Sequence, residues 1–174
     1  MSGHSKWSKI KHKKAMTDAH KSKVFSKLVR YITVEAKRAK GDKNAPGLRL
    51  AIEKARAENM PADNINRAVE KASSAGDLEQ VTYEAYGPGG AAIVIEGFTD
   101  NRNRTSAEIK HLLARSGGSL ATPGAAMWAF SKSESGLEAQ TTIDLSDEDL
   151  EKLATLVDEL EEHDDVNEVV TNAA

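Results

Sequence analysis

The sequence predicts an α+β protein: an N-terminal three-helix domain with a basic tail, followed by a small α+β domain with a mostly antiparallel sheet. The spacing of apolar residues supports this, because it is helical up to about residue 72 and extended after residue 79. The charge also changes sign. Residues 1–71 carry 18 basic and 7 acidic side chains, whereas residues 72–174 carry 6 and 20. The small polar segment 73–79 then predicts two domains, residues 1–75 and 76–174.

The first helix is predicted to begin near Thr17 and to end at Gly41. Its apolar face is formed by residues three or four positions apart, namely Val24, Phe25, Leu28, Tyr31, Ile32 and Ala36. Residues 41–47 contain two glycines and a proline, and they predict a connection.

Two shorter helices are expected next. The first ends before Pro61, because the residue preceding a proline disfavours helical geometry. Asp63 is predicted to cap the second. Their apolar positions are Leu48, Ile52 and Ala55 in one, and Ile65, Ala68, Val69 and Ala72 in the other.

In the second domain, residues 80–86 and 91–98 flank the sequence Gly-Pro-Gly-Gly at 87–90, which predicts two strands joined by a tight loop. This loop lacks the lysine and Ser/Thr of a nucleotide P-loop and precedes a strand, so we interpret it as a structural turn. Further strands are expected at residues 125–130, 141–145 and 166–170.

Two helices are predicted to cover this sheet. Thr105 and Glu108 have the spacing of a capping box for a helix that continues through Arg115. Ser146 is expected to cap the last helix. The inward-facing residues of that helix are Leu150, Leu153, Val157 and Leu160.

Composition excludes several classes of protein. The chain has no cysteine, so it has no disulfide framework or thiolate metal site. The longest apolar run, residues 91–95, is far shorter than the ~20 residues that cross a bilayer. No apolar stretch follows the basic N-terminus, as it would in a secretory signal. We therefore expect a cytoplasmic protein with no membrane partner.

The N-terminal segment is strongly basic. Residues 1–40 carry ten lysines and two arginines against Asp18 and Glu35, which predicts a polyanionic partner. Residues 1–16 lack helical periodicity, so we expect an arm that becomes ordered on binding. Trp7 either stacks on a base or anchors the arm to the helices. The expected nucleic-acid-binding residues are Lys6, Trp7, Lys9, Lys11, His12, Lys13, Lys14, Lys21, Lys23, Lys27 and Arg30.

A second candidate site lies between the second strand and the next helix, at residues 100–105. A helix start offers backbone N–H groups to an anion, and nearby arginines can clamp a phosphate. The expected anion site consists of Asn101, Arg102, Arg104 and Thr105. The alternative is that Asp100 and Asn101 shape the turn while the arginines pair with carboxylates of the same domain.

No catalytic or metal site is expected. His4, His12 and His20 are spaced eight residues apart, but neighbouring lysines oppose binding of a cation. No Ser/His/Asp spacing stands out. A nuclease that uses His12 or His20 as general base is the least favoured hypothesis. We expect no enzyme activity, no cofactor, no metal and no small-molecule substrate.

Several motifs resemble the YebC/PmpR family of probable transcriptional regulators, whose mitochondrial relatives are translational activators. They are GHSKW at residues 3–7, NMP at 59–61, YEAYGPGG at 83–90 and TDNRNRT at 99–105. The resemblance implies three domains, with the third inserted into the second. This chain has only a few residues between 131 and 137, where the insertion is expected, so it resembles a short form with two domains.

The function expected from charge and resemblance together is a non-enzymatic, DNA-binding regulator of transcription. The alternative is a translation factor that binds the ribosome, through rRNA or tRNA, with its basic arm. No helix-turn-helix, zinc finger or basic zipper stands out, so sequence-specific DNA binding is implied by the resemblance alone. RNA binding needs only shape and phosphate contacts. The acidic second domain is expected to be a scaffold or to bind a protein partner.

Overall fold

The computed structural model describes residues 6–12 and 18–174, which form two compact units. The helical unit spans residues 16–79. The α+β unit contains residues 80–174 together with the N-terminal residues 1–15. The predicted α+β class is confirmed. Within the described residues, no helix is both long enough and apolar enough to span a membrane.

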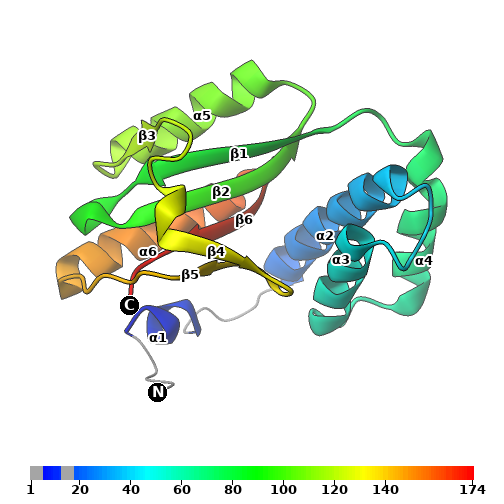
Figure 1. Cartoon of the computed structure of the whole chain (residues 1–174), viewed down its shortest axis with the longest axis horizontal. Helices are drawn as coiled ribbons and strands as arrows, with labels where there is room; N and C mark the ends of the chain where they lie inside the picture. Colours follow the sequence, from blue (N-terminus) through cyan, green and yellow to red (C-terminus); the bar gives the residue numbers. More distant parts are fainter. Residues whose placement is uncertain (1–5, 13–17) are drawn as a thin grey trace. The chain divides into compact units, whose positions relative to one another are not determined.

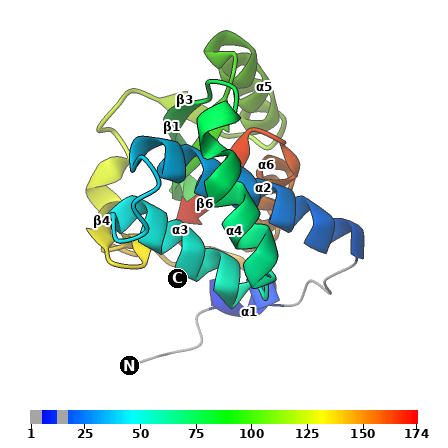
Figure 2. The same cartoon turned by 90° about the vertical axis from the view of Figure 1, so that its right-hand side faces the viewer.

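Three helices build the helical unit (Figures 1 and 2): α2 (Asp18–Arg38), α3 (Pro46–Ala57) and α4 (Ala62–Glu70), followed by the short 3-10 helix η1 (Lys71–Ser74). Their apolar faces meet in one core, which includes Leu28, Ile32, Leu48, Ile52 and Ile65. α2 ends as predicted near Gly41, where Lys40 and Gly41 both have positive φ angles and the Gly41 N–H bonds to the Ala36 carbonyl.

One predicted cap in this unit is wrong. Pro61 stands at the N-cap of α4, and Asp63 lies inside the first turn without a side-chain capping bond. The carboxylate still lies at the positive end of the helix dipole, where it is favourable. α3 begins with Pro46, whose fixed φ suits the first position of a helix.

The sheet of the α+β unit has the strand order β3-β1-β2-β6 (Figure 1). Its strands are β1 (Glu79–Tyr86), β2 (Ala92–Thr99), β3 (Ser119–Ala121) and β6 (Val166–Thr171). β3 pairs antiparallel with β1, and β6 pairs antiparallel with β2. The expected turn at Gly-Pro-Gly-Gly forms a single 3-10 turn, η2 (Pro88–Gly90), between β1 and β2.

Both faces of β2 are covered. Ile93 and Ile95 face the main core, which α5 (Arg102–Arg115) and α6 (Asp147–Glu162) complete. Ala92 and Val94 alternate with them and pack on the other face, against a hairpin of β4 (Phe130–Ser133) and β5 (Gly136–Ala139). This two-sided burial explains why residues 91–95 form the most apolar run of the chain.

Two predicted strands are wrong. Residues 125–129 form a turn that includes the 3-10 helix η3 (Met127–Ala129), because the Glu84 carboxylate accepts hydrogen bonds from the backbone N–H groups of Gly124, Ala126 and Met127. These groups are therefore not free for a strand ladder. Residues 141–145 make only an isolated bridge between Ile143 and Ala173. The strand predicted at 166–170 is present as β6.

Candidate nucleic-acid interface

The basic N-terminal segment contains a short helix, α1 (Lys6–His12), where an arm without structure was expected. Trp7 and Ile10, three residues apart, pack against the main core of the α+β unit. The Trp7 N–H donates to the carbonyl of Ala174 at 3.3 Å. Trp7 is therefore an anchor. The sequence predicts that it packs on the helical domain, whereas in the structure it packs on the core of the α+β unit.

Docking through one face of α1 leaves Lys6 and Lys9 on the surface. The Lys6 side chain is 67% exposed, with its Nζ 3.1 Å from Asp147 at the start of α6. Lys9 is exposed as well. Lys11 and His12 belong to α1, but the structure does not describe their side chains. Lys13 and Lys14 lie outside the described residues. The ion pair of Lys6 is exposed, so a polyanion can replace Asp147 at little cost.

The other expected nucleic-acid-binding residues lie on the first four turns of α2. Lys21 is exposed, whereas Lys23, Lys27 and Arg30 are partly buried. Lys23, Lys27 and Arg30 are separated by four and then three positions, which places them on one side of the helix. They thus form a single stripe of positive charge on the helical unit.

The turn expected to bind an anion has its groups already paired. Asn101, and not Thr105 as predicted, caps α5: its side chain accepts from the Arg104 N–H at 3.1 Å. The Arg104 guanidinium donates to Asp100 at 2.8 Å and to Asp165 at 2.9 Å. Thr105 is fully buried inside the helix. For Arg104, these contacts match the alternative, in which the arginines of the turn pair with carboxylates of the same domain.

Asp165, at the entrance to β6, joins this turn to the rest of the unit. Its Oδ2 lies 2.7 Å from the hydroxyl of Thr105, which also contacts Thr99 at 2.7 Å. Burial would raise the pKa of Asp165, but the bond from Thr105 and the bond and charge of Arg104 outweigh it and lower that pKa. A side chain at Gly97 would collide with the backbone carbonyl of Asp165, so the close approach of β2 to the start of β6 requires glycine at this position.

In the described part of the chain, Glu108, His163 and Asp165 bring three potential metal-binding atoms within 4.8 Å of one another. The hydrogen bonds oppose a metal ion there. The Asp165 backbone N–H donates to Nδ1 of His163, so the ring proton lies on Nε2, which faces Glu108 at 2.5 Å. A metal on Nε2 would need that proton on Nδ1, and Arg104 adds a positive charge beside Asp165.

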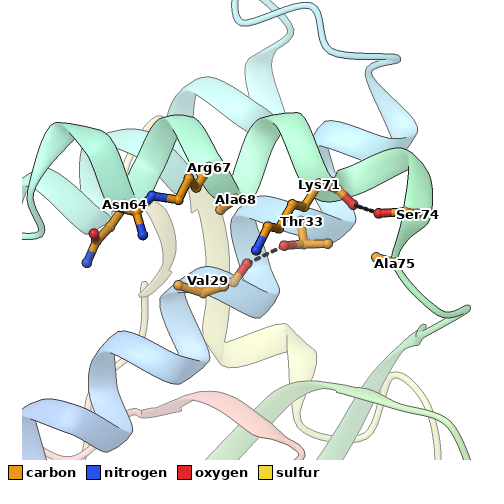
Figure 3. A pocket seen from close by; sticks show the side chains of 8 residues that line it. All are labelled: Val29, Thr33, Asn64, Arg67, Ala68, Lys71, Ser74 and Ala75. Carbon is orange, nitrogen blue, oxygen red and sulfur yellow. Dashed lines mark hydrogen bonds between the residues drawn. The ribbon is translucent and has the colours of Figure 1, made fainter.

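Sequence reasoning missed a groove in the helical unit, between α2 and α4 (Figure 3). It has a volume of about 470 Å³. Its lining consists of Val29, Thr33, Asn64, Arg67, Ala68, Lys71, Ser74 and Ala75. The four-residue spacing of Arg67 and Lys71 on one helix side was the signal available in the sequence. Val29 lies within the first predicted helix, and nothing in the sequence indicated that it lines a groove.

Comparison with known proteins extends to nearly the whole chain. The model described as "TACO1/YebC protein N-terminal domain" matches residues 5–75. The model described as "TACO1/YebC second and third domain" matches residues 78–135 and 129–173. Among solved structures, a conserved hypothetical protein from Aquifex aeolicus superposes with a TM-score of 0.79 at 30% identity, covering 98% of this chain and 97% of that chain.

Three curated relatives are each named "probable transcriptional regulatory protein". That of Chloroherpeton thalassium is 40% identical over 237 aligned residues, covering 99% of this chain and 95% of the relative. This alignment is longer than the 174 residues of the chain, so the relative has residues without a counterpart here. Those of Chlorobaculum parvum and Halothermothrix orenii are 55% and 46% identical, and the chain spans 54% and 63% of their lengths.

Proposed function

The chain belongs to the TACO1/YebC family, and from that premise we propose that it is a non-enzymatic regulator of gene expression that binds nucleic acid. The observation that carries the proposal is the way α1 is held. Trp7 and Ile10 fix the helix to a folded core, and Lys6 and Lys9 remain exposed. Lysines held on a docked helix lose less backbone freedom when they meet a phosphate backbone.

The stripe of Lys23, Lys27 and Arg30 on α2 supplies a second set of cations. Contacts of this kind carry affinity and salt dependence, whereas base edges carry sequence specificity. α3 and α4 are joined by only four residues, with Asn59 in the left-handed conformation, which is the connection length of a helix-turn-helix. However, the exposed positions of α4 include Asp63 and Glu70 as well as Arg67. We therefore assign phosphate contacts, and not base reading in a groove, to this unit.

The curated names of the relatives support transcription as the process, with DNA as the target. An RNA target, the ribosome included, is the second candidate. The groove between α2 and α4 favours it, because a groove of this kind can accept an unstacked nucleotide, which single-stranded RNA presents more readily than duplex DNA. In this proposal the acidic α+β unit is the scaffold that holds α1 or a surface for a protein partner. The β4–β5 hairpin occupies the position at which the resemblance implies an inserted domain in longer relatives.

The test is the salt dependence of binding to a short duplex DNA and to a structured RNA with the same number of phosphates. The variant replaces Lys6, Lys9, Lys11, Lys13 and Lys14 with glutamine. A matched control replaces Lys40, Lys43, Lys54, Lys110 and Lys132, which changes the net charge equally. The proposal expects the slope of log K against log salt to fall by about 0.9 for each lost duplex contact, or about 0.7 for each lost single-strand contact. The control should keep most of the parent slope.

Equal losses in the two variants would show that net charge, and not the N-terminal segment, determines binding. No binding of either polymer by the parent chain would overturn the proposed function. To separate the two targets, the full chain is sedimented with ribosomes in cell lysate at low and moderate salt. Co-sedimentation that the five-lysine variant loses would favour the ribosome, and retention on a specific promoter fragment over competitor DNA would favour transcription.

A further inference from the structure

We propose that the groove between α2 and α4 binds one nucleotide of a single-stranded nucleic acid, with its phosphate held by Arg67 and Lys71 and its base over Val29, Ala68 and Ala75. The polymer that would present this nucleotide is the target of the proposed function, on which the inference rests. The groove lies entirely within the helical unit.

The two cations of the groove are available to a ligand. Arg67 and Lys71 are exposed, and in the described part of the chain neither side chain has a hydrogen-bond or ion-pair partner. Other cations of the same unit are paired. Lys37 binds Asp77 at 2.6 Å, and Arg38 binds Glu35 at 3.0 Å. Figure 3 shows Asn64, Arg67 and Lys71 following one another along one side of α4 and η1, above Val29 and Thr33 of α2.

The other polar groups of the groove are satisfied internally. The Thr33 hydroxyl donates to the Val29 carbonyl at 2.8 Å, and the Ser74 hydroxyl donates to the Lys71 carbonyl at 3.0 Å. Only Asn64 adds a side-chain amide, which can both donate to and accept from a base edge. The groove therefore offers two positive charges and one amide beside an apolar surface.

The apolar surface is what favours a nucleotide over an anion alone. Val29 is 36% exposed, which is unusual here because Trp128 is the only other large apolar side chain exposed to this degree among the described residues. A base has a flat face that can cover Val29 and Ala75. The volume of about 470 Å³ falls within the roughly 300–1,000 Å³ range of small-molecule sites. A glutamate-rich peptide would satisfy the cations but has no aromatic ring for the apolar part.

The test uses the full chain and a nucleoside 5′-monophosphate, followed through the methyl NMR signals of Val29, Ala68 and Ala75. Inorganic phosphate, the unphosphorylated nucleoside and a glutamate-rich peptide are titrated in parallel. The groove variant is Arg67→Gln with Lys71→Gln. Its control is Arg49→Gln with Arg56→Gln, an exposed pair on α3 that makes the same change in charge. Backbone amide spectra of both variants check that each is folded.

We expect the monophosphate to shift the three methyl signals and to bind more tightly than phosphate or nucleoside alone. The groove variant, which removes both cations, should weaken this binding roughly a hundredfold, about tenfold for each cation, whereas the control should stay within about twofold of the parent. If inorganic phosphate alone binds as tightly as the monophosphate, the groove is an anion site and the nucleotide assignment is wrong. Stronger binding of the glutamate-rich peptide would also overturn it.

The inference and the proposed function fail in different ways. If the parent chain binds neither duplex DNA nor RNA but its groove binds the monophosphate, the proposed function is wrong, whereas nucleotide binding by the groove is supported. If a single-stranded RNA binds the groove variant and the parent with equal affinity and equal salt slope, the groove has no role and the proposed function is unaffected.

Discussion

Arg104 on α5 donates a hydrogen bond of 2.9 Å to Asp165, which stands 61 positions later at the entrance to β6. The same guanidinium holds Asp100 at 2.8 Å, so it bridges the two carboxylates. These bonds raise the pKa of Arg104 and keep it charged. A residue that seemed free to bind phosphate in the sequence is thus a structural cation of the α+β unit.

We therefore expect Arg104→Gln to lower thermal stability and to leave nucleic-acid binding unchanged. The loss arises because the buried carboxylate of Asp165 would lose its cationic partner. Thermal unfolding at neutral pH and the salt slope of binding measure the two effects. A drop of about 0.9 in that slope, the value for one phosphate contact on duplex DNA, would mean that Arg104 touches the ligand after all.

Glu84 contributes to the response of the protein to acid. Burial would raise its pKa, but bonds from the N–H groups of Gly124, Ala126 and Met127 together lower it below its usual value. A carboxyl with a lowered pKa in the folded state stabilises that state above its unfolded pKa of about 4.3, and the contribution is lost as the pH falls below it.

Glu84→Gln should cost about 2–4 kcal/mol of unfolding free energy at pH 7, because a neutral amide oxygen replaces a carboxylate that accepts three bonds. The gap between variant and parent should narrow in urea denaturations toward pH 3. Glu134→Gln, an exposed carboxyl between β4 and β5, serves as a control for the loss of one charge. A gap that stays constant with pH would contradict a role for the ionised carboxylate.

Trp7 is expected to hold α1 in place. Trp7→Ala should cost about 1–3 kcal/mol, less than the 3–5 typical of a fully buried aromatic, since Trp7 is only partly buried. Hydrogen exchange of the α1 amides should become faster, whereas Lys9→Ala on the exposed side should leave it unchanged. Quenching of the Trp7 fluorescence by single-stranded RNA in a Trp128→Phe background, without loss of stability in Trp7→Ala, would instead assign Trp7 to base stacking.

Asn172 closes the far end of the sheet. It is 1% exposed, its Oδ1 accepts from the Ala92 N–H at 2.8 Å, and its Nδ2 donates to the Thr141 carbonyl at 3.1 Å. Asn172→Ala leaves both backbone groups without these partners, so we expect a loss of about 2–4 kcal/mol. Asn172→Asp should also destabilise, because it keeps the acceptor but cannot donate to Thr141. A urea midpoint equal to that of the parent in either variant would contradict this account.

Local patterns were sufficient for several elements. The residues from Val24 to Ala36 recur with a helical period over a long segment, and α2 follows that pattern. Ser146 caps α6 as predicted, accepting from the Asp149 N–H, because an N-cap needs only neighbours within the same turn. The tight turn at Gly-Pro-Gly-Gly and the α+β class also depend on short-range signals. The opposite charges of the two halves are a property of composition and need no structure.

The tertiary structure decided everything that depends on partners far apart in sequence. Residues 125–129 have the composition of a strand, but Glu84, about 40 positions earlier, accepts hydrogen bonds from the N–H groups of Gly124, Ala126 and Met127 and so stabilises a turn. Arg104 looks like a phosphate ligand until Asp165 is placed beside it. α1 is too short to form a stable helix alone, and it forms where Trp7 and Ile10 find a core built from residues after position 80. Short-range preference sets where helices and turns can form, whereas the pairing of distant polar groups sets which surfaces stay free to bind.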